Sequence, residues 1–220
     1  MHPVAFSAIY DGEGRNRLTV FFRLIVVIPW LIVAAFWGIA VFFAVVFAWF
    51  ALLFTGRYPE GLYNFNVGFL KFMNRVNGFC WLLTDEWPPF DGDDDFDYPV
   101  RLLVEPPKEE YSRVKVLFRI ILYIPVYILS YIMNIILQLV GLIAWIVMIF
   151  TAKLPEGLYK PMRSASAYVV KASAYAMLIT EDFPPFWEDE YEEAPRFEGG
   201  GGAPAPAAVP PPPPPPAPAG

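Results

Sequence analysis

The sequence has little of the chemistry that enzymes and metal proteins commonly use. It holds one cysteine, Cys80, and one histidine, His2, among its 220 residues. This leaves no basis for a disulfide framework or a Cys/His zinc site, and it removes most histidine-based catalysis. No glycine-rich phosphate loop and no Gly-x-Ser-x-Gly elbow occurs. We therefore expect a protein that is not an enzyme, with no cofactor, no metal and no nucleic-acid partner.

Charge is missing from two long stretches of the chain. No Asp, Glu, Lys or Arg occurs from Leu24 to Gly56 or from Ile120 to Ala152, 33 residues in each case. Each run exceeds the roughly 18 apolar residues that indicate a membrane-spanning helix. The composition agrees, since 56% of the residues are hydrophobic. The N-terminus does not resemble a signal peptide. The sequence thus predicts an all-α membrane protein that keeps its first apolar run.

The chain repeats itself at an offset of 96 residues without a gap. FTGRYPEGLY at 54–63 returns as FTAKLPEGLY at 150–159, and TDEWPPF at 84–90 returns as TEDFPPF at 180–186. A constant spacing of polar and apolar landmarks indicates tandem structural units. We assign three regions: a first membrane repeat at 1–97, a second at 98–193, and a Gly/Pro-rich tail at 194–220.

Each apolar run has two alternative folds. A straight helix of this length would measure about 50 Å, against a hydrocarbon core of roughly 30 Å. Gly38 and the aligned Asn134 lie near the middle of the runs, and both residue types suit a tight turn. We therefore favour a transmembrane helical hairpin in each unit. Its arms would be roughly Arg17–Trp37, kinked by Pro29, and Ile39–Thr55. The alternative is one long kinked span.

A second, amphipathic helix is expected in each unit, at 65–83 and 161–179. Lys71, Arg75 and neighbouring polar residues fall on one face of the first, and Phe69, Phe72 and Phe79 fall on another. Because a charge is costly inside a bilayer, we favour a helix lying in the interface over one that spans the membrane. The repeated decapeptide, at 54–63 and 150–159, would connect the hairpin to this amphipathic helix. In the first unit Thr55 would end the preceding helix, and Pro59 and Gly61 would turn the chain.

The distribution of basic residues predicts a topology. With hairpins and interfacial helices, all sixteen Lys and Arg lie on one side of the membrane. The positive-inside rule makes that side cytoplasmic. We expect a multi-pass protein of the plasma membrane with cytoplasmic N- and C-termini.

Basic residues at the membrane boundary are candidate sites for anionic lipids. Juxtamembrane cations attract anionic headgroups. The alternative is that they only fix the topology. The candidate lipid contacts are Arg17, Arg23, Lys71, Arg75, Arg113 and Arg119.

Acidic segments follow the Pro-Pro-Phe motif in both units, DGDDDFD at 91–97 and WEDEYEE at 187–193. The first alternates carboxylates but has Phe96 and Leu102 where a calcium-binding EF-hand loop needs glycine and glutamate. We interpret both as solvated linkers that could pair with the basic clusters.

The tail contains four consecutive glycines and then seven consecutive prolines at 210–216. Such a composition predicts a disordered segment with polyproline character. It would either bind a cytoplasmic partner through an aromatic groove or have no partner.

Several of these motifs together resemble a known family. They are Arg17-Leu18 with Arg23 and Pro29, Trp49-Phe50 with the segment 53–62, and Leu82 to Asp85 with Pro88 to Phe90. The pattern resembles the bacterial, mainly actinobacterial, integral membrane family catalogued as domain of unknown function 4389, in two tandem copies over roughly 2–193. The resemblance implies an integral membrane protein and supplies no activity. The second copy departs at Ala152, Lys153 and Leu154.

Two functions remain open from the sequence. The first is a non-enzymatic protein that organises the membrane or recruits a partner. The alternative is a pore-forming or accessory subunit of a transport complex, with Asn134 and Gln138 as its polar groups near mid-membrane. Against transport, neither run contains an ionisable residue, the usual mark of an ion pathway. A homo-oligomer is compatible with both.

Overall fold

The computed structural model describes residues 2–11, 16–93 and 97–185. The acidic segment at 187–193 and the Gly/Pro-rich tail lie outside these residues. The described elements are β1 (Val4–Ala8), α1 (Arg17–Val26), α2 (Ile28–Thr55), α3 (Glu60–Cys80), β2 (Val100–Val104), α4 (Arg113–Leu117), α5 (Arg119–Thr151) and α6 (Glu156–Ala176).

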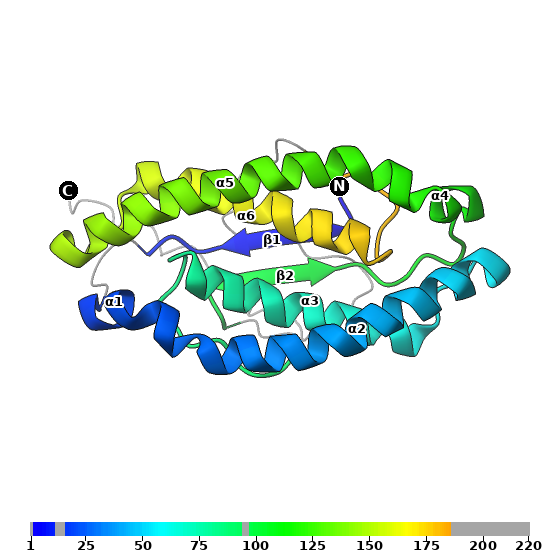
Figure 1. The fold of residues 1–220 in the computed structure, drawn as a ribbon, viewed down its shortest axis with the longest axis horizontal. Helices are drawn as coiled ribbons and strands as arrows, with labels where there is room; N and C mark the ends of the chain where they lie inside the picture. Colours follow the sequence, from blue (N-terminus) through cyan, green and yellow to red (C-terminus); the bar gives the residue numbers. More distant parts are fainter. Residues whose placement is uncertain (1, 12–15, 94–96, 186–220) are drawn as a thin grey trace, which may run out of the picture.

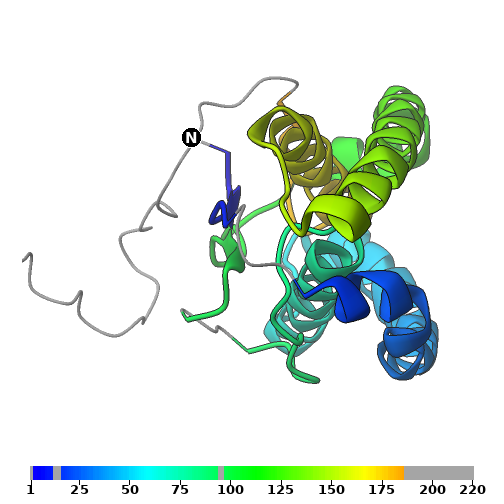
Figure 2. The ribbon, with the colours of Figure 1, turned by 90° about the vertical axis from the view of Figure 1, so that its left-hand side faces the viewer.

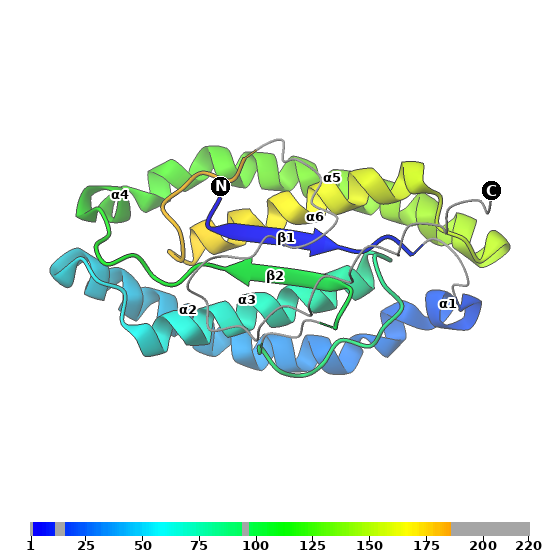
Figure 3. The same ribbon diagram turned by 180° about the vertical axis from the view of Figure 1, so that it is seen from behind.

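The elements form three layers (Figures 1 and 2). The long helices α2 and α5, extended by α1 and α4, make the outer layer. The middle layer consists of α3 on α2 and α6 on α5. A two-stranded antiparallel ribbon of β1 and β2 covers α3 and α6 on their other side (Figure 3). The fold is mostly helical, as predicted. The short two-stranded ribbon was not predicted.

A local two-fold axis relates the two sequence units. The offset of 96 residues maps β1 onto β2 and α3 onto α6 residue by residue. In the ribbon Val4 pairs with Val104 and Ala8 with Val100, which places Phe6 opposite its own repeat counterpart, Leu102. Because α2 and α5 lie on the same side of the molecule (Figure 2), the axis runs across the layers. The two long helices therefore run in opposite directions.

The preference for a hairpin at Gly38 and Asn134 was wrong. Helix α2 continues through Gly38 and α5 through Asn134. A Cβ at Gly38 would lie 3.6 Å from Phe69, so this glycine lies where α3 packs closely against α2. The Asn134 side chain donates to the carbonyl oxygen of Ser130 at 2.8 Å, which satisfies it within its own helix. The long kinked helix, our alternative, is the structure that forms.

The kink in the first unit falls at Val27, between α1 and α2. Pro29 lies in the first turn of α2, where its missing N–H requires no helical partner. In the second unit Pro125 lies inside α5 and the break falls earlier, at Phe118. The starts of the two units match, because Asn16 and Ser112 both cap their helices with a side-chain oxygen.

The repeated decapeptide reverses the chain between the outer and middle layers. Thr55 is the last residue of α2, as predicted, and Gly56 then adopts a left-handed conformation with φ of 72°. Ala152 holds the same conformation in the second unit. Pro59 precedes α3, so Gly61 lies inside that helix. The prediction that Gly61 turns the chain was wrong.

Candidate functional site

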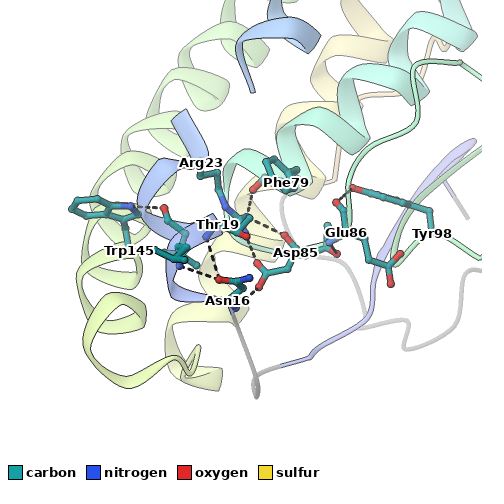
Figure 4. A network of polar contacts seen from close by, with 11 residues as sticks. Asn16, Thr19, Arg23, Phe79, Asp85, Glu86, Tyr98 and Trp145 are labelled. Atoms are coloured by element: carbon teal, nitrogen blue, oxygen red, sulfur yellow. Dashed lines mark hydrogen bonds and ion pairs between the residues drawn. The ribbon is translucent and has the colours of Figure 1, made fainter. Parts of the chain in front are cut away.

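Arg23 forms the centre of a buried polar cluster at the start of the first unit (Figure 4). Arg23 lies on the largely apolar helix α1, and its charged side chain is only 2% exposed. One terminal nitrogen donates to the carbonyl oxygens of Phe79 and of Thr84, the latter at 2.9 Å, and the other contacts the Asp85 carboxylate. The guanidinium also lies over the Phe79 ring, 4.3 Å from its centre. The cluster ties α1 to the end of α3.

The second unit repeats this cluster with two changed side chains, since Tyr175 stands for Phe79 and Glu181 for Asp85. Arg119 is buried, donates to the carbonyl oxygen of Thr180 at 2.6 Å, and lies 3.8 Å from the centre of the Tyr175 ring. Each of these residues is the counterpart, 96 positions later, of a residue at the Arg23 cluster. The carboxylate of the second cluster is Glu181, which is buried, whereas its counterpart Asp85 is half-buried.

The carboxylates of both clusters also hold the start of the neighbouring helix. Asp85 accepts a hydrogen bond from the backbone N–H of the cap residue Asn16 at 3.2 Å. Glu181 accepts one from the backbone N–H of Ser112 at 2.7 Å. A carboxylate at a helix N-terminus is favourable because it meets the positive end of the helix dipole. The repeated Thr-Asp and Thr-Glu motifs therefore fasten α1 and α4.

A further buried cation, Arg75, binds the first acidic segment. One nitrogen donates to the Asp91 carboxylate at 2.9 Å, and the other donates to the carbonyl oxygen of Asp93. Gly92 lies so close to α3 that an added Cβ would be 2.5 Å from the Gly68 carbonyl oxygen. The segment at 91–93 therefore lies against the middle of α3. Arg75 and Asp91 form one pair of the kind that we expected between acidic segments and basic residues.

The six candidate lipid-contacting residues thus fall into two groups. Arg23, Arg75 and Arg119 are buried and have protein partners, which leaves them poorly placed for headgroups. Arg17 and Arg113 are exposed, and Lys71 is half-buried. A lipid-binding role stays a prediction, and the exposed residues are the ones suited to it.

Exposed hydrophobic side chains gather on the apolar face of the outer layer, defined as the exposed side of α1, α2, α4 and α5. Its exposed side chains include Ile28, Ile39 and Phe50 on α2 and Ile128, Ile135 and Leu142 on α5. On α2 the buried residues Trp30, Val41, Ala48 and Leu52 occupy the opposite side, toward α3. Monomeric soluble proteins rarely expose an apolar surface of this extent, which indicates a membrane or partner interface.

Two helices are long and apolar enough to cross a membrane by length and composition, Arg17–Thr55 and Arg119–Thr151. Gln138 is exposed on α5. The other polar group near mid-membrane, Asn134, donates to its own helix, and a role in transport stays a prediction. Among the described residues, no three His, Cys, Asp or Glu side chains converge where they could hold a metal ion.

A cluster of buried tyrosines joins the units at the opposite end from Arg23. Tyr58 donates to the carbonyl oxygen of Met177 in the second unit at 3.1 Å, and its ring lies 6.0 Å from that of Tyr111. Within the second unit, Tyr111 donates to the carbonyl oxygen of Ile179 at 3.1 Å. Tyr58 also accepts a hydrogen bond from Asn66 at 2.8 Å. Burial raises the pKa of Tyr58 to about 12 and that of Tyr111 to about 12. The cluster holds the neutral phenols in place between the units.

Sequence reasoning missed this cluster, although a signal for it existed. Tyr58 belongs to the triplet that the second unit does not keep, where Leu154 replaces it. The structure shows why the units differ: Tyr58 bonds to the second unit, whereas the Leu154 backbone carbonyl accepts from Tyr10 at 2.7 Å. The replacement of Tyr58 by Leu154 was therefore the signal for this contact between the units.

Comparisons with known proteins give one result. A family model described as Domain of unknown function (DUF4389) matches residues 17–91 and 113–188. Neither the search of curated proteins nor that of solved structures found a significant match.

Proposed function

The chain belongs to the Domain of unknown function (DUF4389) family in two tandem copies, and from its structure we propose that it is a non-enzymatic membrane protein that organises the membrane or recruits partners to it. The observation that carries this proposal is the apolar face of the outer layer. Its exposed side chains are aliphatic and aromatic along both long helices, and a bilayer is the surrounding that such a surface suits.

The distribution of charge supports a protein with one membrane side and one aqueous side. All 22 Asp and Glu residues lie outside 17–59 and 111–155, the two stretches that build the outer layer and its connections. Exposed carboxylates such as Asp91 and Asp93 lie instead beside the middle layer. We propose that this acidic part of the molecule faces the cytoplasm at the plasma membrane and presents the surface for partners.

Membrane fractionation tests the proposal. We expect the full-length protein in the membrane pellet, resistant to high salt and to alkaline carbonate, and released by detergent. Recovery in the soluble fraction without detergent would overturn it. A pull-down of cytoplasmic proteins with the full chain and with a chain lacking residues 199–220 tests recruitment by the tail, because only the full chain should retain a partner of the proline run.

A further inference from the structure

We propose that the outer layer lies flat in one leaflet of the membrane, with α2 and α5 parallel to the bilayer plane, and that the protein does not cross the bilayer. This inference rests on the proposed membrane location and goes beyond it. It concerns how the protein meets the lipid, and it identifies an anionic lipid surface as what covers the apolar face.

The length of the helices disfavours a crossing. α2 has 28 residues and α5 has 33, which corresponds to about 42 Å and 50 Å at 1.5 Å per residue. The hydrocarbon core is roughly 30 Å thick, so both helices are too long to span it without strong tilt. A helix parallel to the surface has no such limit on its length.

The other layers exclude a crossing more strongly. α3 and α6 lie alongside the long helices, and the ribbon lies alongside α3 and α6 (Figures 1 and 3). If the long helices spanned the bilayer, the open edges of a two-stranded ribbon would enter it too, and hydrocarbon does not satisfy such edges. The Asp91 and Asp93 segment, which contacts the middle of α3 at Gly68, would lie near mid-membrane.

The local two-fold axis fits the flat arrangement. It runs across the layers, so it would lie along the membrane normal, and both units would meet the lipid in the same way. If the helices spanned the membrane, Arg17 would lie on one side and Arg57 and Arg113 on the other, because α1 and α4 begin at opposite ends of the molecule (Figure 1). Flat helices place all of these residues at one surface, as the positive-inside rule requires.

Charge complementarity identifies the occupant as anionic lipid. The exposed charged residues of 17–59 and 111–155 are all basic: Arg17, Arg57, Arg113, Lys115 and Lys153. The neighbouring exposed carboxylates belong to the adjoining elements, since Glu60 and Glu156 begin α3 and α6 in the middle layer and Glu110 precedes α4. The basic residues lie at the ends of the long helices, where headgroups would surround the apolar face. A second copy of this chain docked through the same face would bring basic ends against basic ends, which is unfavourable.

Cysteine labelling tests the orientation. In a Cys80→Ala background, single cysteines replace Arg17 or Arg57, at the two ends of α1 and α2, and a membrane-impermeant maleimide is added to spheroplasts and to inside-out vesicles. We expect both positions to label in inside-out vesicles and neither in spheroplasts. Labelling of the two positions from opposite sides would overturn the flat arrangement while keeping the membrane location. Recovery of the protein in the soluble fraction would overturn both proposals.

Spin labels measure depth independently of sidedness. Ile28, Ile39 and Phe50 are exposed, and they lie 11 residues apart on one side of α2. In reconstituted anionic vesicles, nitroxides at the three positions should report the same shallow depth. A spanning helix would place Ile39 deepest, which would contradict the proposal. Dipolar coupling between labels on two copies would contradict it as well, because a second copy would then cover the face.

Discussion

The indole N–H of Trp49 in α2 donates a hydrogen bond to the carbonyl oxygen of Val116 in α4, with a length of 3.0 Å. Its repeat counterpart, Trp145, donates to Val20 in α1 at 2.9 Å. The two bonds cross between the units in opposite directions, so they form the kind of reciprocal contact that a two-fold interface requires. The two units are thus joined as the subunits of a symmetric dimer are.

Replacing either tryptophan by phenylalanine should weaken the contact between the units. Trp49→Phe and Trp145→Phe each lose one hydrogen bond, which we expect to lower the free energy of unfolding by about 1 kcal/mol. Unfolding of the detergent-solubilised protein by denaturant measures this change. Trp87→Phe is the control, since Trp87 is 55% exposed and should change stability little. Equal stability of all three variants would show that the reciprocal bonds contribute nothing measurable.

Arg23→Gln should destabilise the fold strongly. The substitution removes the partner of the Asp85 carboxylate and of two backbone carbonyls in a buried site. Breaking a buried ion pair by removing one member costs about 3–5 kcal/mol, and Asp85 remains 23% exposed, so we expect the lower part of that range. Arg17→Gln is the matched control on the same helix.

A loss of stability below 1 kcal/mol for Arg23→Gln would show that the cluster is not structural. The amount of anionic lipid that co-purifies with folded protein then tests a direct lipid role. We expect it to be unchanged by Arg23→Gln, because the guanidinium bonds to protein groups.

Alkaline pH should destabilise the protein through its buried tyrosines. The pKa of Tyr58 is about 12 in the folded protein, against about 10 in an unfolded chain. The folded state therefore favours the neutral phenol, so its contribution is fully present below pH 10 and is lost as the pH rises toward 12. Tyr58 alone should lower the free energy of unfolding by up to about 1.4 kcal/mol per pH unit in that window.

Denaturant unfolding at several pH values from 8 to 12 measures this slope. Tyr58→Phe should reduce the slope and leave the remainder to the other buried tyrosines. These include Tyr111, whose pKa is also about 12, and Tyr63, whose pKa burial also raises. Tyr10→Phe is the control, because Tyr10 is 44% exposed. An unchanged slope in the Tyr58 variant would contradict the burial of its phenol.

The segment at 91–93 should tolerate no side chain at its glycine. Gly92→Ala places a Cβ 2.5 Å from the Gly68 carbonyl oxygen, so the segment must move away and the contact between Arg75 and Asp91 must weaken. We expect a loss of about 1–3 kcal/mol, as for other overpacked sites. Gly61→Ala is the matched control, since nothing lies within 4 Å of its added Cβ. Equal stability of both variants would show that the segment does not pack on α3.

The sequence predicted the parts of this fold that repeat and missed those that depend on distant partners. The offset of 96 residues, the apolar runs and the amphipathic helices all follow from local pattern. The continuity of α2 at Gly38 does not, because a glycine in a turn and a glycine under Phe69 look alike in the sequence. The strands β1 and β2 have five residues each, and their pairing joins residues about a hundred positions apart.

The candidate site shows the same limit. A juxtamembrane arginine that binds lipid and one that is buried have the same sequence context, and only the position of Asp85, 62 residues later, separates them for Arg23. The conserved spacing between Arg23 and the Thr-Asp motif in both units was nevertheless visible, and it could have indicated a contact within each unit.

Binding to anionic vesicles should depend on the exposed basic residues at the start of each unit. Arg17 and Arg113 are exposed, and each cation near an anionic surface contributes about 1 kcal/mol. The double variant Arg17→Gln/Arg113→Gln should therefore bind phosphatidylglycerol vesicles more weakly, by about tenfold or more, with a smaller dependence on salt. Lys160→Gln is the control, because Lys160 lies on α6 and pairs with Glu156 at 3.0 Å. Partition of detergent-diluted protein into vesicles with and without the anionic lipid measures the effect.

Since a flat outer layer places both arginines at the same headgroups, each single variant should lose about half of the effect in free energy. A loss confined to one of the two would contradict the symmetric contact.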